Sequence, residues 1–395
     1  MSDILREAIQ INDKLIKHRR YLHKNAECGF NLTKTLDYIE NELINLGYSP
    51  KRIGKGSIYA QIGDGDGGSL LRADIDALIT DEESNVCYAS KNGKMHACGH
   101  DMHTAMLLGA AELLAISKSK LKSKTTLLFQ GGEEILEGAY DTLEHGILKV
   151  SNANKAISLH VIPAIQMKTG TLLLPNGGTA APAADFFSID LVGRACHGST
   201  PWMGDDALGV SCKIVSHLTE SLTRKISPSH GGIISIGRLV GGKAGNIIAD
   251  SARLEGTVRC NSDKIQAELK EQIIKAVYGI SILHNIEPKV TYLGGAPTLV
   301  IDKALAEKIK SILIKEIGKE LVVSYDTKDN NANGDLGGSE DFAHFSHKIP
   351  SILIGICAGA PSEGYNYPLH HPKVTFDERS LPIGAACYTA FAQIE

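Results

Sequence analysis

The sequence predicts an α/β protein in which a mixed-sheet domain carries an inserted α+β domain. Apolar segments of strand length alternate with amphipathic helical segments over residues 1–184 and 296–395, which is typical of a sheet covered by helices. Between them, residues 185–295 change to strands of alternating polarity. A chain of 395 residues is also longer than one simple core usually supports, which favours two domains.

The composition excludes several classes of function. Hydrophobic residues make up 43% of the chain and charged residues 22%, as in ordinary globular proteins. The formal net charge of −4 offers no basic surface for nucleic acid. No apolar run approaches the roughly 18–20 residues of a membrane span. We therefore expect neither a nucleic-acid nor a membrane partner.

The cysteines lack the paired spacing of a disulfide framework, and the charged start at residues 1–7 does not resemble an export signal. Both observations predict reduced thiols and a cytoplasmic location. The cysteines are Cys28, Cys87, Cys98, Cys196, Cys212, Cys260, Cys357 and Cys387. Only Cys98 lies among other potential metal ligands.

Helices open the chain, because apolar residues recur at helical spacing over residues 3–49. A strand at 57–62 leads into a glycine-rich turn at 63–68, which we interpret as a hairpin turn into the strand 69–78. Asp74 and Asp76 close that strand, and alternation predicts both on one face. Such a pair is more commonly a helix cap or part of an ion pair, but strand ends in open α/β sheets also bind ligands.

Residues 96–103 read HACGHDMH, with three histidines, a cysteine and an aspartate in eight positions. Thiolate and imidazole are the usual ligands of zinc and related metals. The stretch precedes a predicted helix at 101–117, so a polar cluster near a helix start is the alternative interpretation. The stretch alone favours a metal site.

Potential ligands also follow two other apolar strands: Glu133 and Glu134 after the strand at 125–130, and His160 at the end of the strand at 155–160. An isolated acidic pair in a loop is usually solvated, and a lone histidine is usually a core residue. The repeated position after apolar strands predicts instead that these residues meet Asp76 and Cys98 at one edge of the sheet.

After residue 184 the predicted order is β-α-β-β-α-β, which is the signature of a ferredoxin-like sandwich. The expected elements cover residues 185–192, 205–225, 233–240, 252–259, 262–284 and 288–292. We interpret residues 185–295 as an insertion into one larger domain formed by residues 1–184 and 296–395. That larger domain should also contain helices at 137–149, 302–317 and 378–393, a loop at 326–338, a short helix capped by Ser339, and a strand at 351–356.

Nine motifs occur in the order found in a known family. They are RYLH at 20–23 with Glu27 and Gly29, LRADIDAL at 71–78, HACGHDMHT at 96–104, Phe129-Gln130 with Glu133-Glu134, His160, residues 193–201 with His197, GTVR at 256–259, EDF at 340–342, and Leu369-His370. The chain thus resembles the aminoacylase/carboxypeptidase-type metallopeptidase family, in its amidohydrolase branch of hippurate hydrolases, auxin-conjugate hydrolases and N-acetyldiaminopimelate deacetylases. The implied fold is a zinc-peptidase-like α/β catalytic domain with an inserted dimerisation or lid domain.

The resemblance implies a site for two divalent metal ions. The implied ligands are Cys98, His100, Glu134, His160 and His370. Glu133 would be the general base, and Asp76 would orient a metal ligand. His103 would either support a ligand or be purely structural. The branch implies manganese, and the donor set also suits zinc or cobalt.

The resemblance also implies a substrate and an assembly. The substrate would be an N-acyl amino acid, such as an N-acetyl or N-benzoyl compound, cleaved to a carboxylate and a free amino acid. Arg259 and Asn246 match positions that bind its α-carboxylate. His197 matches a histidine that reaches the partner subunit's site in a homodimer paired through the inserted domains. Without the resemblance, Arg259 would be a surface ion-pair residue and His197 an exposed loop residue.

Two other functions stay open at this stage. A dipeptidase or carboxypeptidase of the same broad family would share the metal chemistry. A metal-binding protein that has lost catalysis would lack Glu133 or a ligand, and none of these is missing. The family's usual Pro-Ala before the acidic pair is Gly131-Gly132 here, a departure that would affect the shape of the pocket.

Overall fold

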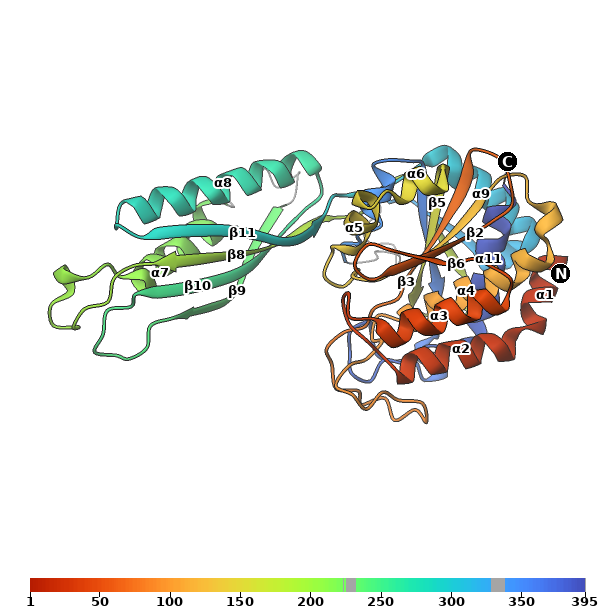
Figure 1. Cartoon of the computed structure of the whole chain (residues 1–395), viewed down its shortest axis with the longest axis horizontal. Coiled ribbons are helices and arrows are strands. Elements are labelled where there is room, and N and C mark those ends of the chain that lie inside the picture. The colour runs from red at the N-terminus through yellow and green to blue at the C-terminus, as the bar shows by residue number, and fades with distance from the viewer. Residues whose placement is uncertain (223, 225–231, 328–337, 395) are drawn as a thin grey trace. The chain divides into compact units, whose positions relative to one another are not determined.

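The computed structural model describes residues 1–222, 224, 232–327 and 338–394 and divides the chain into two compact units (Figure 1). Unit 1 comprises Met1–Ala180 and Leu299–Glu395, and unit 2 comprises Ala181–Thr298. Unit 2 begins four residues before the predicted start at 185 and ends three residues after the predicted end at 295.

Eight strands of the described chain form one mixed sheet in unit 1, in the order β1-β2-β4-β3-β5-β14-β6-β13. They are β1 (Lys51–Ile53), β2 (Ser57–Ile62), β3 (Gly68–Asp74), β4 (Thr125–Gln130), β5 (Ala153–Ile162), β6 (Leu172–Pro175), β13 (Val322–Tyr325) and β14 (Ser351–Cys357). Strands β4, β3, β5 and β14 run parallel, whereas β6 and β13 run in the opposite direction. Every residue of β3, β4 and β14 is buried, as expected for central parallel strands.

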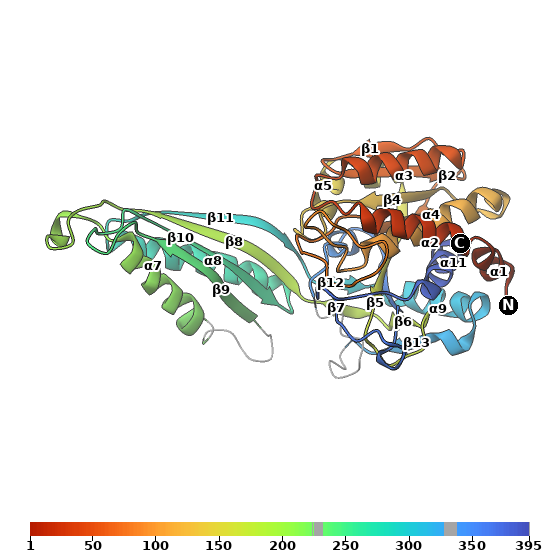
Figure 2. The same cartoon turned by 90° about the horizontal axis from the view of Figure 1, so that it is seen from below.

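Helices α4 (His100–Ile116) and α11 (Leu381–Ala392) pack on each other and on β3 and β5. Both are apolar on nearly all sides, which is why they occupy the core and not the surface. Helix α1 packs on α11, so the two ends of the chain lie on the same side of unit 1 (Figure 2). The other helices of unit 1 are α1 (Asp3–Gln10), α2 (Asn12–Lys24), α3 (Thr33–Asn45), α5 (Gly138–Glu144), α6 (Ile147–Ser151), α9 (Lys303–Glu316) and α10 (Ala343–Ser346).

Unit 2 has the element order β8-α7-β9-β10-α8-β11 that the sequence predicts for its ferredoxin-like sandwich. Its strands β8 (Ala183–Val192), β9 (Gly232–Gly241), β10 (Ser251–Cys260) and β11 (Glu287–Ala296) form an antiparallel sheet in the order β11-β8-β10-β9. Helices α7 (Ala207–Ser216) and α8 (Asp263–Ile282) bury their apolar sides against Phe187, Ile189 and Leu254 of this sheet. Outside both sheets, β7 (Gly178–Ala181) pairs with β12 (Leu299–Ile301), where the chain passes between the units.

Several predicted elements are wrong. The turn at 63–68 is not a hairpin turn, because β4 lies between β2 and β3 in the sheet. The helix expected at 137–149 is two short helices, because Gly146 adopts a left-handed backbone that ends the first of them. Ser339 does not cap a helix, since α10 begins at Ala343 with Phe342 as its N-cap residue.

Two further expectations fall partly outside the described residues. Helix α7 ends at Ser216, a π-helical turn covers 217–222, and the rest of the predicted helix at 205–225 is largely not described. Most of the predicted loop at 326–338 is likewise outside the described ranges. Among the helices that are described, none combines the length and apolar character that a membrane crossing requires.

Candidate metal centre

The carboxyl ends of β4, β3 and β5 meet at one edge of the unit 1 sheet, because these strands are adjacent and parallel. Asp76 follows β3, Glu133 and Glu134 follow β4, and His160 lies near the end of β5. His100 begins α4, which packs on β3 and β5. The strand-end side chains predicted to meet therefore do meet.

All five predicted metal ligands lie together. The Cys98 Sγ atom is 3.4 Å from His160 Nε2 and 3.2 Å from His370 Nε2. Glu134 lies 3.8 Å from both His100 Nε2 and His370 Nε2. Ligand atoms bonded at about 2.0–2.3 Å to one tetrahedral ion are separated by similar distances.

These atoms form two overlapping groups that share Cys98. One group is Cys98, His100 and His160, and the other is Cys98, Glu134 and His370; in each group the ligand atoms lie within 4.8 Å of one another. Two groups that share a thiolate suit two neighbouring cations, because the residues of each group would hold one cation and Cys98 would belong to both groups.

Two buried polar atoms in this cluster have no hydrogen-bond partner among the described residues. They are His100 Nε2 and Glu134 Oε1, which face each other across 3.8 Å. Leaving buried acceptors unsatisfied is costly. A divalent cation bound by both atoms would remove that cost, so the donor set fits a metal ion.

In two of the histidine ligands, buried His100 and partly buried His160, the Nδ1 nitrogen is already engaged. His100 donates its Nδ1–H to the Asp76 carbonyl at 2.9 Å, and His160 donates its Nδ1–H to the Val161 carbonyl at 2.9 Å. These hydrogen bonds leave Nε2 of each ring as the free lone pair. The rings are therefore oriented toward Cys98 before any ion is bound.

Asp74 and Asp76 do not act as a pair, and their predicted position on one strand face is wrong because β3 ends at Asp74. Asp74 accepts hydrogen bonds from His103 Nδ1 at 2.5 Å and Arg72 Nη1 at 2.8 Å. His103 Nε2 accepts the Val161 N–H at 2.8 Å. Both nitrogens of His103 are thus occupied, which supports a structural role beside His160 and not ligation.

The Asp76 carboxylate binds the backbone of the turn that carries Glu133 and Glu134, here called the acidic turn. Its two oxygens accept the backbone N–H groups of Glu133 and Glu134, at 3.1 and 3.2 Å. Its own carbonyl accepts the His100 ring proton. One residue therefore fixes the positions of Glu133, Glu134 and His100 relative to one another.

Local packing explains the glycines that precede the acidic turn. Gly132 has a φ of +81°, and a Cβ atom there would lie 2.6 Å from the Phe30 ring. A Cβ on Gly131 would lie 2.5 Å from the Gly56 carbonyl oxygen. Leu32 and Phe30 fill the space that larger residues would need, so the departure from Pro-Ala follows from the packing of this chain.

Sequence reasoning missed Asp341, whose motif it noted without a role. Asp341 is fully buried and accepts hydrogen bonds from Arg72 Nη2 at 2.6 Å, Gln130 Nε2 at 2.8 Å and the Ala139 N–H at 2.7 Å. Gln130 and Ala139 stand at the two ends of the segment that carries Glu133. Asp341 therefore anchors both ends of the turn whose middle Asp76 holds.

The cluster is rich in buried negative charge. Burial, with the neighbouring carboxylates of Glu340 and Glu134, raises the pKa of Glu133 well above its usual value. Burial and the nearby Asp76 raise the pKa of Glu134 to about 7, although His100 acts in the opposite direction. Burial and Glu134 also raise the pKa of the Cys98 thiol. Bound divalent cations would reverse these shifts by stabilising the anionic forms.

Other residues of the HACGHDMH stretch belong to a second buried cluster. Asp101 pairs with Arg19 at 2.7 Å and His23 at 2.9 Å, and His23 also contacts Glu82 at 3.0 Å. Burial lowers the pKa of His96, beside this cluster, to about 3. These contacts fasten α2 and the loop before Cys98 to the start of α4, which is a structural role.

The predicted substrate residues lie in unit 2, at two separate places. His197 and Asn246 are exposed and adjacent, since the Gly198 N–H donates to the Asn246 carbonyl at 2.7 Å. Arg259 is half-buried on β10, opposite Ala184 of β8. Arg259 lies eight residue steps along β10 from Ser251 at the other end, which is about 26 Å at the usual rise of an extended strand.

Comparison with known proteins identifies relatives over nearly the whole chain. The model of the peptidase family M20/M25/M40 matches residues 70–394. The N-acetyl-L-cysteine deacetylase of Bacillus subtilis is 32% identical over 94% of this chain and 85% of that protein. The N-acetyldiaminopimelate deacetylase of the same organism is 30% identical over 97% and 98%. A crystal structure of a dinuclear metal-binding peptidase of the M20 family from Bacillus subtilis superposes with a TM-score of 0.74, at 27% identity over 97% of this chain and 98% of that chain.

Metal affinity should increase with pH. Because the pKa of Cys98 is raised in the metal-free protein, the thiol keeps its proton at neutral pH and must lose it on binding. The dissociation constant should fall by about tenfold per pH unit for each proton released. Chelator competition between pH 6 and 8 measures this slope. Cys98→Ala should lower this slope by about one proton, while Glu134 still releases its own, and exposed Cys87→Ala should leave the slope intact. An unchanged slope in Cys98→Ala contradicts thiolate ligation.

Asp341→Asn should loosen the acidic turn, because an amide nitrogen would face the Ala139 N–H in place of a carboxylate oxygen. We expect metal affinity or kcat to fall by about 10- to 100-fold, as for other groups that orient ligands. Steady-state kinetics and metal titration measure both. Asp141→Asn is the matched control, since Asp141 is buried in α5 and accepts the Lys55 N–H without contacting the turn. If the two substitutions lowered metal affinity and kcat equally, Asp341 would contribute only to the stability of the fold.

Proposed function

Because the chain belongs to the peptidase family M20/M25/M40, we propose that it is a metal-dependent amidohydrolase of N-acyl amino acids. It would cleave their amide bond to a carboxylate and a free amino acid. One observation carries this proposal: the buried carboxylate of Glu133 lies 4.0 Å from His100 Nε2, on the same turn as Glu134. A proton acceptor thus stands beside the candidate metal ligands.

The relatives support the substrate class. Two of them are named as deacetylases of N-acetyl-L-cysteine and N-acetyldiaminopimelate, and both compounds are amides of an amino acid. We therefore propose N-acetyl amino acids as the first substrates to examine, with N-benzoyl amino acids as the next class.

Cys98, His100, Glu134, His160 and His370 would hold two divalent ions, which when bound lower the pKa of water and polarise the substrate carbonyl. Manganese is our first candidate, and a thiolate with imidazoles also accommodates zinc or cobalt. The similar structure from Bacillus subtilis is that of a dinuclear metal-binding peptidase, which supports a pair of ions.

Glu133 would accept the proton of the attacking water and deliver it to the nitrogen of the leaving amino acid. The position of this buried carboxylate suits both steps, since it lies 4.0 Å from Nε2 of the candidate metal ligand His100. Asp76 keeps the Glu133 backbone in place through its hydrogen bond to the N–H.

Arg259 would bind the α-carboxylate of the substrate, because a guanidinium donates two parallel hydrogen bonds to a carboxylate. Burial lowers the pKa of Arg259, which marks a partly desolvated cation. His197 and Asn246 lie in loops beyond the Ser251 end of β10, too far from Arg259 for both places to reach one small molecule from the same copy. We therefore propose a homodimer in which they come from the partner subunit.

Glu133→Gln should lower kcat by about 10²- to 10⁴-fold, because it removes the proton acceptor. Metal content should stay unchanged, since Glu133 lies outside both groups that share Cys98. Kinetics with an N-acetyl amino acid and elemental analysis measure the two effects. Glu137→Gln, a half-exposed residue of the same loop, should be near wild type. Full turnover by metal-loaded Glu133→Gln would refute the role.

Complementation tests the dimer. Arg259→Met and His197→Ala should each be nearly inactive. A mixture refolded or co-expressed at equal ratio should regain about a quarter of wild-type activity, because half of the random dimers contain one intact site of two. The size of the assembly by light scattering is the control. Absence of any recovery in confirmed mixed dimers contradicts a site shared between subunits.

A substrate panel tests the reaction class. The manganese-loaded and the chelator-stripped protein are incubated with N-acetyl and N-benzoyl amino acids and with dipeptides, and free amino acids are measured by mass spectrometry. We expect metal-dependent release from an N-acyl class. Cleavage of dipeptides alone would replace our proposal by a peptidase function, and silence across the panel despite bound metal would refute both.

A further inference from the structure

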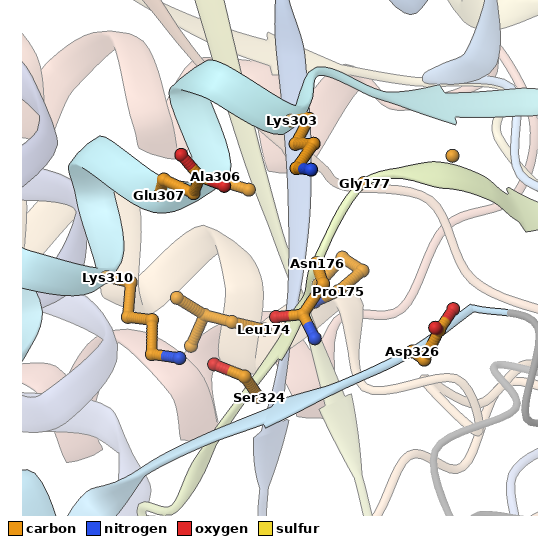
Figure 3. A pocket seen from close by; sticks show the side chains of 11 residues that line it. Leu174, Pro175, Asn176, Gly177, Lys303, Ala306, Glu307, Lys310, Ser324 and Asp326 are labelled. Atoms are coloured by element: carbon orange, nitrogen blue, oxygen red, sulfur yellow. The ribbon is translucent and has the colours of Figure 1, made fainter.

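A cavity of about 530 Å³ lies in unit 1 beside α9 (Figure 3). It opens at the carboxyl ends of β6 and β13. These two strands run opposite to β3, β4, β5 and β14, so the cavity lies at the other edge of the sheet from the candidate metal centre. Carboxyl ends of strands are where ligands bind in open α/β sheets, and the volume suits a small molecule.

Specific contacts shape this cavity. The Asn176 N–H, just after β6, donates to the Tyr325 carbonyl of β13 at 2.9 Å. Thr327 Oγ1 donates to the Gly177 carbonyl at 2.9 Å. A Cβ atom on Gly177 would lie 2.9 Å from Lys303 Cβ, so the strand ends also pack closely on α9. The ends of β6 and β13 and helix α9, which line the cavity, are therefore in direct contact with one another.

Unpartnered polar groups line the cavity. Lys303 and Lys310, two turns apart on α9, form no ion pair with any part of the chain that the structure describes. The hydroxyl of Ser324 on β13 is buried and, within the same described residues, has no hydrogen-bond partner. Figure 3 shows Lys310, Ser324 and the Asn176 amide around the same space.

The lining also carries the negative charge of Glu307, which lies on α9 between the two lysines. Two ammonium groups and the carboxylate of Glu307 therefore line one cavity. A simple dianion would be attracted by the lysines and repelled by Glu307, whereas a ligand that carries both signs can match all three groups. The charge pattern therefore selects for a zwitterion.

We propose that this cavity binds an acidic amino acid or a closely similar amino dicarboxylate. Its two carboxylates would pair with Lys303 and Lys310, with Ser324 and Asn176 as neutral hydrogen-bond donors. Its ammonium group would face Glu307. The inference concerns binding at a site remote from the metal centre and does not depend on the proposed amide hydrolysis.

Calorimetric titration of the full, metal-loaded protein with L-glutamate tests the proposal. Glutarate, which is the same molecule without the ammonium group, and γ-aminobutyrate, which lacks the α-carboxylate, are the matched probes. We expect saturable binding of glutamate and binding of each probe about three- to fivefold weaker, as for the loss of one partly exposed ion pair. Glutarate that binds as tightly as glutamate would refute the role of Glu307.

Variants locate the site. Lys310→Met should weaken glutamate binding by about tenfold, since it removes a charge-assisted hydrogen bond, and should leave amide hydrolysis unchanged. Lys315→Met, on the exposed side of the same helix next to Glu316, should bind glutamate as wild type does. His370→Ala should also retain binding. Loss of binding in His370→Ala with retention in Lys310→Met would assign the ligand to the metal centre and overturn the proposal, as would no saturable binding below about 10 mM.

Discussion

Arg72 is fully buried on β3, so its positive charge has to be neutralised by acidic and polar groups inside the protein. This requirement determines how the segments next to the candidate metal centre are arranged. Its guanidinium donates to Gln130 on β4 at 3.1 Å, to Asp74 at 2.8 Å and to Asp341 at 2.6 Å. A buried cation without such partners would destabilise the fold by several kcal/mol. Strands β3 and β4 and the segment before α10 therefore converge on this one group.

The hydrogen bonds continue from Arg72 to both sides of the metal centre. On one side, Asp74 accepts a hydrogen bond from His103, which in turn accepts the N–H of Val161, the residue after His160. On the other side, Asp341 accepts the N–H of Ala139, which follows Glu134 by five residues. Such a network positions ligands before an ion arrives. His370 differs, because its backbone has a φ of +67° and its side chain is 55% exposed. The His370 N–H donates a hydrogen bond to the Ala97 carbonyl at 2.9 Å. This hydrogen bond holds the residue in a left-handed backbone conformation that costs about 1–3 kcal/mol.

The sequence predicted the edge of the sheet at which the ligands meet, because Glu133 and Glu134 follow one buried strand, His160 lies near the end of another, and parallel neighbours share an edge. It did not predict that β4 lies between β2 and β3, since strand pairing depends on contacts far apart in the chain. For the same reason Asp341, which contacts Arg72 across 269 residues, carried no local signal of its role. The break at Gly146 was a local signal that helical periodicity concealed.

In unit 2, β10 pairs with both β8 and β9, which places Arg259 near one end of the sheet and the loops that carry His197 and Asn246 beyond the other end. An N-acyl amino acid is far shorter than that strand, so a single copy of the chain cannot bring both ends to one substrate. A common role for these residues therefore requires two copies. The β9 strand has a neighbour on one side only in the described sheet and exposes Ile233 and Val240, features that natural proteins usually cover. A second copy paired at this edge would cover the strand.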